Sequence, residues 1–127
     1  MEITHRTNNL RISPRKLRLV ADKIRHQNAQ AALDMLPLVV NKGAGLLYSS
    51  LKSAVQVAED NDLDTTQLSI QRIWCDEGSK LKRAVHRSRG RMNRIIKHNS
   101  HVSIVLKGEP RKAAKRKSTP ESVAEGQ

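Results

Sequence analysis

The sequence predicts an α+β fold in which three helices pack on a small antiparallel sheet and a long, basic β-hairpin projects from the body. Apolar residues recur at helical spacing through residues 14–61, and the segments on the two sides of Gly90 have strand composition, with clean alternation after it. Residues 78–108 hold nine Lys or Arg and no Asp or Glu. This charge distribution, with a net charge of +12 over 127 residues, favours a polyanionic partner.

The length fits one domain of about 100 residues followed by a tail. We expect residues 1–108 to form the domain, with the hairpin at about 76–101. Residues 109–127 hold Pro110, Pro120 and a basic cluster at 111–117, which is typical of a disordered basic and polar tail. Its cations either touch phosphate or only keep the chain in solution.

The N-terminal half predicts one extended segment and one helix. Residues 2–12 are polar with scattered apolar positions, which indicates an extended arm or edge strand. Ser13 and Pro14 predict a helix from Pro14 to about residue 26, because a serine side chain caps free N–H groups and proline is tolerated at the first helical position. The apolar stripe of this helix consists of Leu17, Val20, Ala21 and Ile24.

Two further helices follow. A short one is predicted over residues 28–36, with Asn28 as its cap and Pro37 ending it. A longer one is predicted over residues 41–61, where Leu47, Leu51, Ala54, Val55 and Ala58 share a face. Gly43 and Gly45 in its first turns indicate either close approach of another backbone or fraying.

An acidic linker at residues 60–64 precedes the predicted strands and is expected to be solvated. Residues 68–75 have strand composition, and Val102, Ile104 and Leu106 alternate on the returning side. The part between them has too few apolar residues to bury, so it must project. About ten residues along each arm, at a rise near 3.4 Å, give a protrusion on the order of 35 Å.

The predicted hairpin carries the candidate binding residues. Each phosphate that they neutralise releases counterions, so binding is expected to depend strongly on salt. Arginine predominates near the turn at Gly90, where its planar fork can hold a phosphate bidentately or stack on a base. The cations are Lys80, Lys82, Arg83, Arg87, Arg89, Arg91, Arg94 and Lys97.

The first predicted helix carries a second basic face. Arg15, Arg18 and Arg25 fall together on it, although Asp22 lies there too. This face is either simply solvated or a continuation of the surface that binds nucleic acid.

Several functional classes find no support. Tyr48 and Trp74 are the only aromatic residues, so there is no platform on which successive bases stack. We expect Trp74 to pack in the core or at the hairpin base. Cys75 is interpreted as a small hydrophobe, and His98 and His101 lack the further ligands of a metal site. No phosphate-binding loop or nucleophile motif occurs, so we expect neither catalysis nor a cofactor.

Membrane association is also disfavoured. No segment approaches the roughly 20 apolar residues that span a bilayer. The N-terminus lacks the apolar region of a signal peptide. We therefore expect a cytoplasmic protein.

Two binding interpretations remain. One is a structural RNA-binding protein of a large ribonucleoprotein, and the other is a histone-like architectural DNA-binding protein with basic β-arms. The architectural class wedges an apolar residue, commonly proline, into the base stack. Here no proline occurs between Pro37 and Pro110, and the predicted tip reads Arg-Ser-Arg-Gly-Arg over residues 87–91, which favours RNA.

The sequence resembles the bacterial large-subunit ribosomal protein L twenty-two family over nearly all of residues 1–107. The resemblance departs at Ser79 and His86, where the family usually has prolines, and at Gly43 and Gly45, where it has more helix-favouring residues. The matching motifs are Ser13-Pro14-Arg15-Lys16 with Arg18-Leu19-Val20-Ala21-Asp22 and Ile24-Arg25; Leu51, Ser53-Ala54, Ala58-Glu59 and Asn61; and Asp76-Glu77-Gly78, Lys82-Arg83, Arg87, Arg89-Gly90-Arg91 and Ser100-His101-Val102.

The resemblance implies a structural constituent of the large ribosomal subunit. Its body would dock on large-subunit rRNA beside neighbouring ribosomal proteins, and its hairpin would line the exit tunnel and meet the nascent polypeptide. Neither a membrane nor a small-molecule substrate is implied. The rRNA contacts would come from Lys82, Arg83, Arg87, Arg89, Arg91 and Arg94 near the tunnel constriction, and from Arg15, Lys16, Arg18 and Arg25 on the body.

Overall fold

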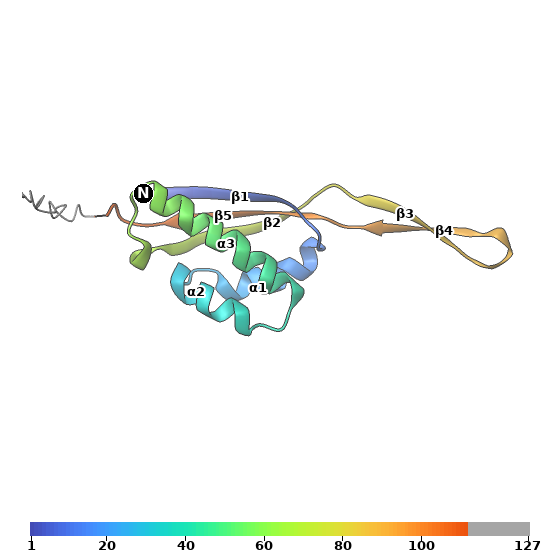
Figure 1. Ribbon diagram of the computed structural model, residues 1–127, viewed down its shortest axis with the longest axis horizontal. Helices are drawn as coiled ribbons and strands as arrows, with labels where there is room; N and C mark the ends of the chain where they lie inside the picture. Colours follow the sequence, from blue (N-terminus) through green and yellow to red (C-terminus); the bar gives the residue numbers. More distant parts are fainter. Residues whose placement is uncertain (112–127) are drawn as a thin grey trace, which may run out of the picture.

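The computed structural model describes residues 1–111 of the chain. It has the predicted α+β class, with three helices packed on a small antiparallel sheet (Figure 1). Along the chain the elements are β1 (Glu2–Leu10), α1 (Pro14–Ile24), α2 (Ala29–Met35), the 3₁₀ turn η1 (Leu36–Leu38), α3 (Lys42–Asp60), η2 (Thr65–Gln67), β2 (Ser69–Glu77), β3 (Leu81–His86), η3 (Ser88–Gly90), β4 (Met92–Lys97) and β5 (Ser100–Lys107).

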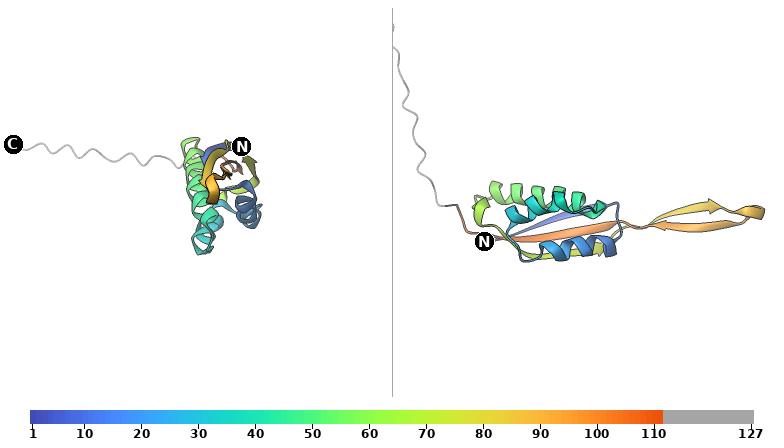
Figure 2. Two further views of the ribbon diagram at one scale, coloured as in Figure 1. Left: turned by 90° about the vertical axis from the view of Figure 1, so that its right-hand side faces the viewer. Right: turned by 90° about the horizontal axis from the view of Figure 1, so that it is seen from below.

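The body contains a three-stranded sheet in the order β1-β5-β2. Its central strand, β5, is antiparallel to both neighbours, so β1 is the edge strand that the sequence indicated. Helix α1 packs along β2, while α3 packs along β1 and β5. Strands β3 and β4 form a separate two-stranded sheet that extends beyond the body along the direction of the other strands (Figure 2).

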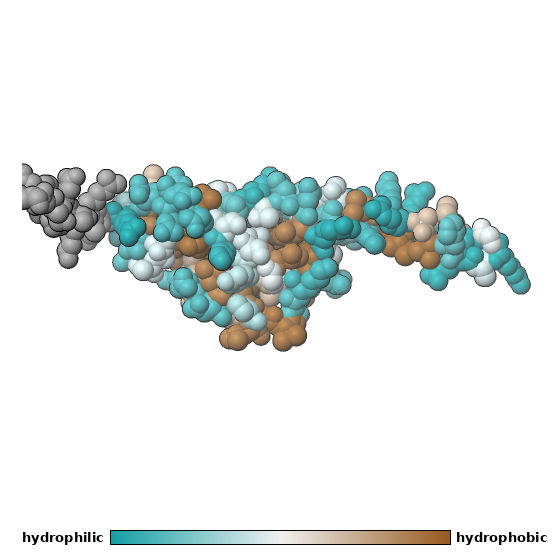
Figure 3. Space-filling view, viewed as in Figure 1, coloured by the Kyte–Doolittle hydropathy of each residue, from teal (hydrophilic) through white to brown (hydrophobic). Residues whose placement is uncertain are grey.

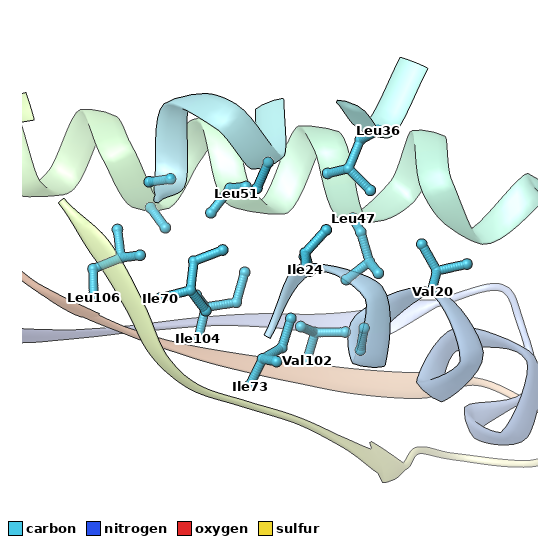
Figure 4. Close-up of a cluster of buried hydrophobic side chains, with 14 of the residues drawn as sticks. Val20, Ile24, Leu36, Leu47, Leu51, Ile70, Ile73, Val102, Ile104 and Leu106 are labelled. Carbon is cyan, nitrogen blue, oxygen red and sulfur yellow. The ribbon is translucent and has the colours of Figure 1, made fainter. Parts of the chain in front are cut away.

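The hydrophobic core lies between the helices and the three-stranded sheet (Figure 4). The predicted stripe of α1 is almost fully buried, and Val20 and Ile24 point toward Leu47 and Leu51 of α3. The sheet contributes the alternating positions of β5, including Ile104, which confirms the strand spacing seen in the sequence. Along β5, the hydrophobic core therefore extends only as far as the alternating apolar residues do.

Of the two predicted helix caps, one forms the expected hydrogen bond and the other does not. Ser13 and Pro14 occupy the predicted cap and first position of α1, but the Ser13 side chain makes no capping hydrogen bond. By contrast, Asn28 Oδ1 accepts from the backbone N–H of Gln30 at 2.9 Å, which confirms the cap of α2. Pro37 lies within η1, one residue beyond the start of that turn.

Gly43 allows α3 to start close to α1. A Cβ atom at this position would lie 3.4 Å from side-chain carbons of both Ile12 and Leu17. The close approach therefore involves side chains and not another backbone. A Cβ atom at Gly45 would have no neighbour within 4 Å, so packing does not explain why this residue is glycine.

The outer edge of β2 is covered along its length. The chain between α1 and α2 pairs with its start, since Ile70 N–H donates to the Gln27 carbonyl at 2.9 Å and Ala29 N–H donates to the Leu68 carbonyl at 2.8 Å. Further along, arginines of α1 reach the exposed carbonyls of Ile73 and Cys75. These contacts remove an open strand edge.

The structure excludes the core for Trp74, which was one of the two places expected for it. Its neighbours Ile73 and Cys75 are 3% and 2% exposed, whereas Trp74 is 41% exposed. Because successive side chains of a strand point to opposite faces, Trp74 lies on the face away from the helices. Cys75 is the small buried hydrophobe that the sequence indicated.

The acidic linker is partly structural. Asp64 caps η2, where its carboxylate accepts from the Thr66 hydroxyl at 2.7 Å and from the Thr66 N–H at 3.0 Å. These hydrogen bonds lower the pKa of Asp64.

The first residues after the predicted domain boundary contact the body. Arg111 N–H donates to the Asp62 carbonyl at 2.7 Å, and Asp64 N–H donates to the Glu109 carbonyl at 2.9 Å. Residues 112–127, which make up most of the predicted tail, lie outside the described part of the chain.

Leu51→Ala is expected to lower the free energy of unfolding by about 2–5 kcal/mol, because Leu51 is fully buried and its removal leaves a cavity. Leu38→Ala is the matched control. This leucine is 80% exposed, so the expected change is within about 0.5 kcal/mol. Urea denaturation of both variants checks this, and equal losses would contradict the assignment of the core.

The stability of the body should depend on pH through Cys75. Burial raises the pKa of its thiol from an ordinary value of 9.0 to about 11. The folded state therefore holds the proton more tightly, and the unfolding free energy falls as pH rises from about 9 toward 11. Cys75→Val should lose less stability than the parent between pH 7 and pH 10 in denaturant titrations. Parallel pH profiles would show that the thiol contributes nothing.

Candidate nucleic-acid interface

The projecting arm is an antiparallel ladder of six residue pairs, from Leu81 with Lys97 at its base to His86 with Met92 near its tip. It lies outside the hydrophobic core, and β3 and β4 pack on each other (Figure 1). An isolated two-stranded ribbon is marginally stable in water. The β3–β4 ribbon by itself therefore adds little to the free energy of folding.

Both faces of the arm carry cations beside apolar side chains. Residues paired across a ladder share a face, so Lys82 lies beside Ile96, while Arg83 lies beside Ile95 on the opposite face. Ile95 and Ile96 are 43% and 44% exposed. Figure 3 shows hydrophilic and hydrophobic patches alternating along the arm. The arm can thus contact a polyanion on two sides at once.

The tip is a tight turn at the predicted glycine. The N–H of Arg87 donates to the Arg91 carbonyl at 2.7 Å, which closes the turn. Arg89 and Gly90 have φ angles of 59° and 70°, a region that glycine adopts without cost and arginine does not. A Cβ on Gly90 would meet nothing within 4 Å, so the backbone angle is what requires glycine. The turn presents three exposed arginines at 87, 89 and 91.

Residues 78–80 and 98–99 form the neck between the body and the arm, where the two chain segments lie close together. The N–H of Gly78 donates to the Asn99 carbonyl at 2.8 Å, and a Cβ on Gly78 would lie 3.1 Å from the Asn99 backbone. Ser79, where the resembled family usually has proline, accepts a long hydrogen bond of 3.5 Å from the Asn99 amide. The close backbone approach holds the two halves of the neck together where no ladder pairs occur among residues 78–80.

Most of the predicted binding residues have no acidic partner among residues 1–111. The ion pairs in this range are Lys80 with Glu77 at 3.3 Å and Arg25 with Asp22 at 2.9 Å, both on the surface. The other cations of the arm are exposed side chains. Their charge is therefore compensated by solvent ions, which a bound polyanion releases.

The basic residues of α1 divide into two kinds. Arg18 donates from Nε and Nη2 to the Cys75 carbonyl at 3.1 and 2.8 Å, and Arg25 Nη2 donates to the Ile73 carbonyl at 3.4 Å. These two side chains help hold α1 on the edge of β2. Arg15 is exposed without such contacts, and Lys16 lines a surface hollow beside the neck.

Two cations that the sequence analysis did not single out lie in the same place. Arg11 and Lys42 join Lys16 and Lys97 around this hollow. They come from four separate segments of the chain, and no spacing in the sequence indicates that the fold brings them together. Within residues 1–111, no group of three or more His, Cys, Asp or Glu is arranged to hold a metal ion. In that same range no helix has the length and apolar character needed to span a membrane.

The α+β body with an exposed basic arm has the form of basic proteins that are suited to associate with polyanions. The family model of ribosomal protein L22p/L17e matches residues 5–107. The chain is also 42% identical over 97 residues to the large ribosomal subunit protein uL22 of Desulfosudis oleivorans, covering 76% of this chain and 85% of that protein. The chain belongs to the ribosomal protein L22p/L17e family. It is a structural constituent of the large ribosomal subunit and not an enzyme, with rRNA and other ribosomal proteins as its partners.

Arg18→Gln is expected to lower the free energy of unfolding of the isolated protein by about 1 kcal/mol, because the Cys75 carbonyl loses its charged donor. Arg15→Gln removes the same charge from the same helix without breaking a described contact. It should change the free energy of unfolding by less than about 0.5 kcal/mol. Denaturant titration of the free proteins distinguishes the two. Equal values would mean that the contact to β2 does not stabilise the body.

Proposed function

We propose that the chain binds large-subunit rRNA through its hairpin and the basic residues of its body, supports assembly of the subunit, and lines the nascent-peptide exit tunnel with the hairpin. The observation that carries this proposal is the exposed ladder of β3 and β4, which bears cations on both faces and contributes nothing to the core. Such an arm is suited to a site enclosed by RNA.

The arm would act as a brace between RNA segments. Segments of rRNA repel one another, and cations on opposite faces of one ribbon allow two of them to approach it together. The apolar residues between the cations, such as Ile95 and Ile96, would be covered by the sugars and bases of the same segments. The arm would then gain in the complex the burial that it lacks in the free protein.

The tip residues would face the tunnel. Arg87, Arg89, Gly90 and Arg91 lie at the far end of the arm, where a passing polypeptide could meet them once rRNA encloses β3 and β4. Lys80, Lys82, Arg83, Arg94 and Lys97 would then contact phosphates along the arm. On the body, Arg15 and Lys16 are free to extend this surface, whereas Arg18 and Arg25 would do so with the part of each guanidinium not engaged by β2.

One experiment tests the proposal with the tagged chain in a cell lysate. We expect it to sediment with large subunits and to form ultraviolet crosslinks from residues 81–97 to tunnel-wall rRNA. A variant in which Asn-Gly replaces residues 83–95 joins the paired positions Lys82 and Ile96, and should fold with nearly unchanged stability but associate weakly with subunits. This variant loses five arginines.

The control carries the same loss of charge elsewhere, with glutamine at the five basic positions of residues 111–117. It should sediment with large subunits like the parent. Crosslinks spread over DNA without subunit association would overturn the proposal and favour the histone-like alternative. Unfolding of the shortened variant under conditions where the parent is folded would contradict the division into body and arm.

A further inference from the structure

A hollow of about 510 Å³ lies on the surface where the hairpin leaves the body. Its walls come from the β1–α1 connection, the start of α1, the start of α3 and the neck after β4. One hydrogen bond joins two of these walls, because the hydroxyl of Ser100, which follows Asn99, donates to the Ile12 carbonyl.

Four cationic side chains surround this hollow and no acidic residue lines it. Arg11, Lys16, Lys42 and Lys97 are all exposed, and His98 lies beside them. None of the four cations is within ion-pair distance of a carboxylate in the described range. Close approach of four like charges is unfavourable by itself, so an anion placed between them would relieve their repulsion.

Two helices also begin at this hollow. Ser13 and Lys42 line it, and they mark the starts of α1, which has 11 residues, and α3, which has 19. Neither cap residue, Ser13 nor Asn41, uses its side chain to accept a hydrogen bond from the first turn. The positive ends of both helix dipoles therefore favour an anion at the hollow, although Pro14 has no N–H and the Ala44 N–H already donates to the Asn41 carbonyl at 2.9 Å.

An unsatisfied polar group borders the same place. Asn99 is 7% exposed, and its side-chain Oδ1 has no hydrogen-bond partner among the described residues. A buried acceptor without a donor is costly. A phosphate offers no donor to it, but a ribose hydroxyl does, and in RNA one accompanies every phosphate. Because this oxygen has almost no accessible surface, the hydroxyl reaches it only when the Asn99 side chain turns into the hollow.

We propose that this hollow, which we call the neck pocket, binds the sugar-phosphate backbone of RNA. Arg11, Lys16, Lys42 and Lys97 neutralise the phosphate, and the positive ends of the α1 and α3 dipoles favour it there. Asn99, turned into the pocket, accepts from the adjacent ribose hydroxyl. The pocket anchors the body at the point where the arm leaves it. This inference rests on the proposed binding of rRNA and assigns it a second contact, separate from β3 and β4.

Lysine reactivity in the unaltered protein tests the pocket. Trace acetylation is measured by mass spectrometry on the free chain and on the chain bound to large-subunit rRNA transcript, with no other protein present. We expect the reactivity of Lys16, Lys42 and Lys97 to fall several-fold on binding. Lys23 and Lys52 lie exposed on the same two helices outside the pocket and serve as internal controls.

The hairpin lysines separate failure of the pocket from failure of the proposed function. Protection of Lys80 and Lys82 without protection of Lys16 and Lys42 would overturn the neck pocket and leave rRNA binding by the arm intact. Unchanged reactivity of every lysine would overturn both.

A pair of matched variants gives a second readout. For the same transcript, the logarithm of the binding constant falls linearly with the logarithm of the salt concentration. K16Q/K42Q should make this slope less steep by about 1 to 2, since each lost phosphate contact lowers its magnitude by roughly 0.7–0.9. K23Q/K52Q removes the same charge from the same helices and should leave the slope near that of the parent. Equal slopes for the two variants would contradict the pocket, provided that both unfold at the parent's denaturant midpoint.

Discussion

The pairing of β2 with β5 is the constraint on which the rest of the structure depends. These strands lie next to each other in the sheet and supply much of the core, and the same two strands lead into the arm. From Ile70 to Cys75 one face of β2 is apolar and covered by α1. Beyond Glu77 the apolar residues are too few and too exposed to form a core, so the chain leaves the body as a ribbon.

This arrangement separates the two kinds of interaction that hold the protein and its complex. Hydrophobic burial between three helices and three strands stabilises a body that is close to neutral in charge. The exposed cations are concentrated on the arm and its base, whose eight Lys and Arg residues within 78–98 have few acidic partners. Under the proposed mode of binding, the stability of the free protein and its affinity for rRNA are set by different residues. The exceptions are Arg18 and Arg25, which serve the body by covering the edge of β2.

The sequence predicted those features that depend on neighbours along the chain. Helical spacing and cap signals located α1, α2 and α3 to within a few residues, strand composition located β2, and alternation located β5. Features that depend on contacts between distant segments were missed or wrong. The sequence left open whether Trp74 packs in the core or at the hairpin base, and strand alternation with the placement of α1 turns it away from the core. Nothing in the spacing of Arg11, Lys42 and Lys97 indicated that they meet, since their convergence follows from the packing of α3 on α1 around Gly43.

The central claim is that the arm is held by its RNA surroundings and the body by its own core. Amide hydrogen exchange, measured on the free protein and on assembled large subunits, tests it most directly. Amides of β3 and β4 should exchange far faster than those of β5 in the free protein and become protected in the subunit, while β5 stays protected in both. Equal protection of β3 and β5 in the free protein, or fast exchange of β3 within the subunit, would contradict the account.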